Sequence, residues 1–286
     1  MCIRDRLLLA LNLWRASFIR HPFIALKTWT YRAVWFPFIL YIVIDILLAP
    51  SHLFGHIYME SILGYDTLNV ISLNWAVLLG IIVGAGFTLF TFSRRKWRYK
   101  TMTVIAFSSI TGYLMYFYFG IDYALPKETL FVPLFLRSFG YVIIAICFLT
   151  VLSRVPFQHF FQAVSVQSFV SAGFGGALGT AILGHALNGA MKKNSMLLGS
   201  VVDHVNPFIS RIPVGEVYGA VQQQALMVSM KELYGWLTLM ALFCLLAFLV
   251  YESDIRPYKV LHPTYRSIRR FVKHELRIDK KLEATA

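Results

Sequence analysis

The sequence contains few of the residues on which enzymes and secreted domains commonly depend. Only three of its 286 residues are cysteine, and two of these, Cys147 and Cys244, lie inside apolar runs. The sequence has neither a disulfide framework nor the spacing of a metal site. The G-x-S-x-G and H-E-x-x-H motifs of hydrolases are also missing. We therefore expect no enzymatic activity, no bound metal and no cofactor.

Charged residues are also scarce. They make up 14% of the chain, whereas 58% of it is hydrophobic, and the mean hydropathy is +0.63. The apolar residues form runs of about 20 residues, the length that an α-helix needs to cross a bilayer. The six runs are 34–57, 68–90, 101–120, 130–152, 162–187 and 227–251. They lack the strict alternation of barrel strands. The sequence therefore predicts an all-α membrane protein with six transmembrane helices.

The segments outside these runs predict the domain organisation. Residues 1–33 are basic, and their short apolar stretch is only about a third of a span. We expect these residues to be a cytoplasmic linker with a truncated start, so that the chain is a fragment of a longer protein. Residues 188–226 are expected to form one long external loop, and residues 253–286 a cytoplasmic basic tail.

Acidic residues are few, and the basic residues are unevenly placed. Most of the 27 lysines and arginines precede the first run, separate the second from the third, or follow the sixth. Because cytoplasmic loops favour Lys and Arg, both termini are predicted to be cytoplasmic, in a bacterial inner membrane. The net charge of +13 is then explained by topology and contact with the lipid bilayer, so no nucleic-acid partner is expected.

Ionisable residues at bilayer depth are costly and therefore suggest function. Asp45, His52 and His56 fall on one face of the first predicted helix, because positions i, i+7 and i+11 nearly coincide in an α-helix. They could line a cavity, but Asp45 could instead pair with a buried Arg, and His56 could be interfacial. Arg137 could extend toward the lipid interface or pair with a carboxylate or an anionic ligand. Gln162 could line the cavity or satisfy neighbouring helices.

Small residues recur at intervals of four within two of the runs. Such spacing lets transmembrane helices approach closely. We therefore expect helix packing at Gly80, Gly84, Gly175, Gly176 and Gly179.

Four stretches together resemble the C-terminal half of a major facilitator superfamily transporter, of the 14-span drug–proton antiporter type. They are His21–Leu26, Glu60–Leu68, Leu136–Gly140 and Phe174–Ala181. The resemblance covers about residues 20–255. The basic loop Arg94–Arg98 has the charge of the superfamily's signature loop but lacks its Gly and Asp.

The resemblance implies a six-helix bundle built from two inverted three-helix repeats. It would pack against the missing N-terminal half of the same transporter and export drug-like or amphipathic small molecules in exchange for protons. Asp45, His52 and Arg137 would face the substrate. The alternative is a non-transporting six-span scaffold or lipid-handling protein.

Overall fold

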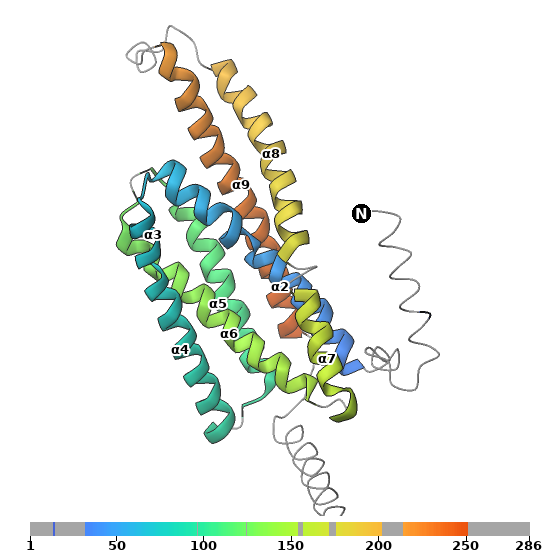
Figure 1. Ribbon diagram of the computed structural model, residues 1–286. Helices are drawn as coiled ribbons and strands as arrows, with labels where there is room; N and C mark the ends of the chain where they lie inside the picture. Colours follow the sequence, from blue (N-terminus) through green and yellow to red (C-terminus); the bar gives the residue numbers. More distant parts are fainter. Residues whose placement is uncertain are drawn as a thin grey trace, which may run out of the picture.

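The fold is described from a computed structural model of the chain (Figure 1). Every regular element in the described residues is helical. The description covers Trp14 and residues 32–95, 97–123, 125–153, 157–171, 176–201 and 214–250.

Five of the six predicted transmembrane runs are present as helices long and apolar enough to cross a membrane. The first begins at Arg32 in α2 and continues beyond Ile57 as a π-helical turn. The second combines the short α3 with α4, and the last is the long α9. The bounds are α2 Arg32–Ile57, α3 Thr67–Ser72, α4 Asn74–Phe90, α5 Tyr99–Gly120, α6 Phe131–Leu152 and α9 Val214–Val250.

The remaining predicted run, residues 162–187, is described only in part, and one helix over its whole length stays a prediction. This region contains the end of α7 (Phe157–Phe169) and the beginning of α8 (Gly176–Val201), with residues 172–175 outside the description. Neither α7 nor α8 is among the five helices that could span a membrane.

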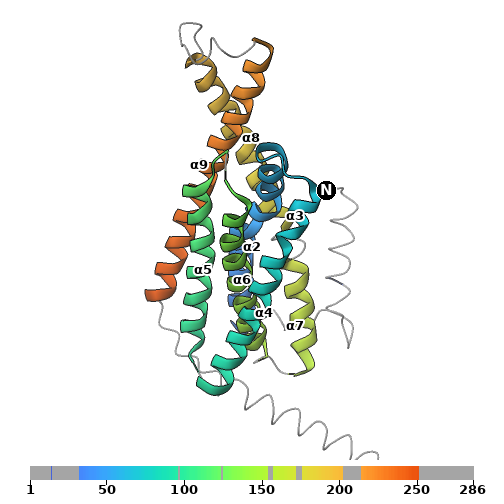
Figure 2. The same ribbon diagram turned by 90° about the vertical axis from the view of Figure 1, so that its left-hand side faces the viewer.

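The predicted loop over residues 188–226 is also largely helical. Helix α8 extends to Val201 and α9 begins at Val214, so the two helices form an antiparallel hairpin. The far ends of both extend beyond the other helices in two perpendicular views (Figures 1 and 2). At about 1.5 Å per residue, the 37 residues of α9 extend for ~55 Å, well beyond the thickness of a hydrocarbon core.

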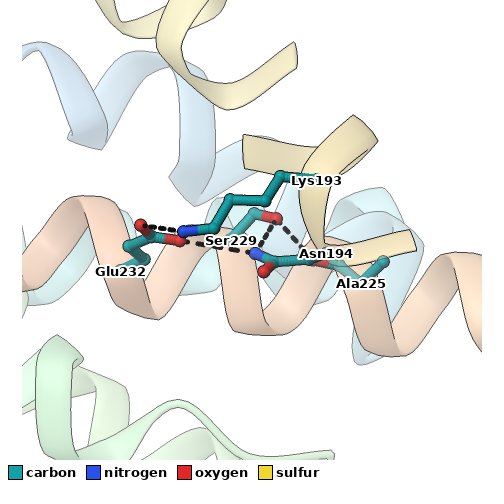
Figure 3. A network of polar contacts seen from close by, with 5 residues as sticks. All are labelled: Lys193, Asn194, Ala225, Ser229 and Glu232. Atoms are coloured by element: carbon teal, nitrogen blue, oxygen red, sulfur yellow. Dashed lines mark hydrogen bonds and ion pairs between the residues drawn. The ribbon is translucent and has the colours of Figure 1, made fainter. Parts of the chain in front are cut away.

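Polar contacts between α8 and α9 explain why this segment is helical (Figure 3). Asn194 is buried, and its Nδ2 donates to Ser229 Oγ at 2.9 Å and to Glu232 Oε2 at 3.5 Å. Lys193 Nζ forms an ion pair with Glu232 Oε1 at 3.1 Å. The polar residues that suggested a loop thus pair with each other across two helices.

We expect Asn194→Ala to lower the free energy of unfolding by about 2 kcal/mol, because it removes the hydrogen bonds that Asn194 donates to Ser229 and Glu232 across the two helices. The measurement is thermal unfolding of the detergent-solubilised protein, followed by tryptophan fluorescence. Asn188→Ala is the matched control, since Asn188 is an exposed residue of the same helix. Equal effects of the two substitutions would contradict this assignment.

An aromatic cluster joins α2, α5 and α9 at the centre of the bundle. The ring of Tyr234 stacks on Phe117 with centroids 5.2 Å apart, and Phe54 meets Tyr234 edge-on at 5.6 Å. Tyr58 packs edge-on against Phe117, and its hydroxyl donates to the Asp122 carbonyl at 2.7 Å. The cluster therefore fixes the end of the first span against the loop that follows α5.

Glycines permit close contact between two pairs of helices. A Cβ atom at Gly80 of α4 would lie 2.7 Å from the Phe135 carbonyl oxygen of α6, and one at Gly84 would lie 3.1 Å from that of Phe139. Gly179 of α8 packs against Ala49 of α2, at 2.9 Å from an added Cβ to the Ala49 Cβ. Gly176 has only the Ser171 carbonyl oxygen nearby, at 3.8 Å. Close helix contacts are thus found at Gly80, Gly84 and Gly179, and Gly175 lies outside the described residues.

The two ends of the bundle differ in charge. Arg94, Arg95 and Arg98 lie at the end where α4 passes to α5, and Glu60 and Asp66 lie at the opposite end, where α2 passes to α3. The projecting hairpin is at the acidic end (Figure 2). This separation is what the distribution of basic residues in the sequence predicts for a protein with one cytoplasmic face.

Several predictions concern positions outside the description. They are the tail 253–286, nearly all of the linker 1–33, Gly175 and the side chain of His56.

Candidate functional site

A cavity of about 420 Å³ lies between helices α2, α4 and α6. Its lining is mainly apolar and includes Leu48, Val77 and Ile81. Three ionisable side chains that the sequence singled out also line it: Asp45 and His52 from α2, and Arg137 from α6. All three lie within the helices that are long and apolar enough to cross a membrane. The structure thus brings together ionisable groups from separate helices in one cavity.

The polar groups of the cavity occupy two levels. On α2, Asp45 and His52 are seven positions apart, which is ~10 Å along the helix axis. On α6, Arg137 and Tyr141 are one turn apart, or ~6 Å. Arg137 lies at the level of His52, and Tyr141 lies nearer the level of Asp45.

The antiparallel course of α2 and α6 produces this arrangement. Tyr41, near the beginning of α2, packs against Phe148, near the end of α6, with ring centroids 5.0 Å apart. Starting from this contact, residues later in α2 lie opposite residues earlier in α6. Asp45 therefore lies opposite Tyr141. His52 lies opposite Arg137, one to two turns further along the helices.

The Asp45 carboxylate is not neutralised by Arg137. Its Oδ2 atom is buried without a hydrogen-bond partner, and within the described part of the chain no ion pair joins it to Arg137. Ser171, which follows α7, lies within hydrogen-bonding reach of the carboxyl group. The alternative in which Asp45 is the structural partner of a buried arginine is therefore not supported for Arg137.

The cavity is open on one side. His52 is exposed, and Tyr141 is 39% exposed, although both line the cavity. Gly176, the first residue of α8, contributes to the wall. A molecule in the cavity would therefore contact α2, α4, α6 and the beginning of α8, and would remain accessible from the side of His52 and Tyr141.

Gln162 does not line this cavity. It lies on α7, where its Oε1 is 3.5 Å from His159 Nδ1. Sequence reasoning missed Tyr141 and Ser171. The position of Tyr141, one helical turn after Arg137, would have indicated a shared face, whereas no pattern in the sequence indicates Ser171.

In the part of the chain that the structure describes, no cluster of three or more His, Cys, Asp or Glu residues could hold a metal ion. Comparison with known proteins identifies no relative, since no family model and no curated protein matches the sequence. The described residues are helical, five of their helices are long and apolar enough to span a membrane, and a cavity with ionisable groups lies between three of these five.

Proposed function

We propose that this chain is part of a secondary transporter that exports amphipathic small molecules across a bacterial inner membrane by proton antiport. The described helices would form one bundle of a two-bundle permease, with both termini in the cytoplasm. The substrate would bind between the bundles, and rocking of one bundle against the other would alternate access to it.

The observation that supports this proposal best is the convergence of Asp45, His52 and Arg137 on one open cavity. Ionisable side chains within membrane helices commonly mark substrate or ion pathways, because their insertion costs about 2.5–3.5 kcal/mol each. The open side, where His52 and Tyr141 are exposed, suits a second bundle that completes the substrate path. The lining of aliphatic side chains with a few polar groups suits an amphipathic substrate.

The test is a flux measurement on the protein expressed from its complete reading frame and reconstituted into liposomes. We expect an imposed pH gradient to drive uptake of fluorescent amphipathic compounds, and addition of such a compound to release protons. A pH-sensitive dye enclosed in the liposomes reports the proton movement. If neither flux exceeds that of protein-free liposomes across a panel of cationic, neutral and zwitterionic compounds, the protein is not this kind of transporter.

A further inference from the structure

Most of the polar features outside the cavity are explained by packing between helices. The cavity has one property that general transport of amphipathic compounds does not explain. Asp45 and Arg137 both line it, together with apolar side chains, yet among the described residues no ion pair joins them. If they served only to satisfy each other in the bilayer, Asp45 and Arg137 would be expected to form an ion pair, because unpaired charges in a membrane are costly.

We propose that the cavity binds a small zwitterion whose two charges are separated by several methylene groups. The anionic group of the ligand would lie at Arg137 and His52, and its cationic group at Asp45. This inference rests on the proposed function, because it names the substrate class of the same cavity.

The electrostatics at the two levels favour this orientation of the ligand. Arg137 presents a planar guanidinium, which is suited to a carboxylate or phosphate, and His52 adds a second nitrogen donor at the same level. At the other level, the buried Oδ2 of Asp45 lacks a hydrogen-bond partner, so an ammonium group would supply one. The hydroxyl groups of Tyr141 and Ser171 lie near this carboxylate and could also contact the ammonium.

The spacing between the two levels selects the length of the ligand. The two levels are ~6 Å apart along the axis of α6 and ~10 Å apart along that of α2, and a ligand with several methylene groups between its charges can extend over this spacing. Leu48 and Ala49 lie between Asp45 and His52 on α2, and Val77 faces the cavity from α4. These side chains would contact the methylene groups between the two charges.

The test compares four ligands on the purified protein in nanodiscs, with binding measured by calorimetry. The ligands are 6-aminohexanoate, its single-charge analogues hexanoate and hexylamine, and the short zwitterion glycine. We expect 6-aminohexanoate to bind at least about tenfold more tightly than each of the others, because each charge contact that is lost weakens binding by a factor of this order.

Two variants assign the ends of the ligand. Asp45→Asn should reduce the affinity for 6-aminohexanoate to that for hexanoate, and Arg137→Gln should reduce it to that for hexylamine. Asp122→Asn, in an exposed loop, is the control and should leave all four affinities unchanged. Thermal unfolding of each variant shows whether it is folded. His52→Gln is a second variant at the level of the cavity where Arg137 lies.

The outcomes separate this inference from the proposed function. Hexylamine or hexanoate binding as tightly as 6-aminohexanoate would overturn the inference, as would failure of all four ligands to bind. If amphipathic monocations are nevertheless transported in liposomes, the proposed function stands without the inference. Binding of 6-aminohexanoate with the predicted dependence on Asp45 and Arg137, but without any flux, would support the binding site and overturn transport.

Discussion

Gly80→Val is expected to lower the free energy of unfolding by about 3 kcal/mol, because side chains inserted into a well-packed interface cost about this much. A Cβ at Gly80 would lie 2.7 Å from the backbone oxygen of Phe135, 2.9 Å from the Cβ of Ser138 and 3.2 Å from the backbone nitrogen of Phe139. None of these atoms is the end of a flexible side chain. Valine would therefore force α4 away from α6, and the cavity wall formed by Val77 and Ile81 would move with α4.

Gly86→Val provides the control on the same helix, because no atom lies within 4 Å of a Cβ built at Gly86. Both substitutions introduce the same β-branched residue into α4, so their intrinsic effects on helix formation should cancel. The measurement is the unfolding midpoint in detergent, together with the fraction of protein that elutes as a single species. A Gly80→Val protein as stable as the Gly86→Val protein would show that α4 and α6 do not pack as described.

Asp45→Asn should lower the rate of proton-coupled transport at least about tenfold, since it removes a charge contact worth roughly 1.5–3 kcal/mol to a ligand. It also removes the carboxyl group that would take up and release the proton. Asparagine has nearly the same shape, and Asp45 makes no ion pair with Arg137, so membrane insertion and folding should be preserved. The assay is the liposome flux measurement, with the amount of inserted protein measured in parallel.

Asp122→Asn is again the matched control. Asp122 lies in an exposed loop, where its Oδ1 accepts a hydrogen bond from the Tyr123 backbone nitrogen, and the amide oxygen of asparagine can do the same. Transport by the Asp122→Asn protein should equal that of the unmodified protein. If the Asp45→Asn protein also transports at the unmodified rate, Asp45 has no part in the mechanism.

Hydropathy alone was sufficient to predict five of the helices, because a span of about 20 apolar residues is a property of consecutive residues. It failed where the fold depends on pairing between distant segments. Residues 188–201 are polar enough to resemble a loop, but Asn194 and Lys193 are satisfied by Ser229 and Glu232 of α9. These partners are not adjacent in the sequence, so no local pattern could show that the segment is helical.

The candidate site shows the same limit. Helical periodicity placed Asp45 and His52 on one face of α2, and the structure finds both in one cavity. The antiparallel packing of α2 and α6 places Arg137 opposite His52, and Tyr141 opposite Asp45. The sequence alone does not show this packing. Gln162 has a polar side chain at the start of an apolar run, as a cavity residue would, but α7 places it elsewhere.

The projecting hairpin of α8 and α9 has a practical use. Its base includes Gly176 at the cavity wall, while its far end extends beyond the other helices (Figures 1 and 2). A helix ~55 Å long amplifies small rotations, so a tilt of about 10° would displace its far end by ~10 Å. A spin label or fluorophore at Gly215, which is exposed and has no atom within 4 Å of an added Cβ, would therefore report motions at the cavity from outside the bilayer.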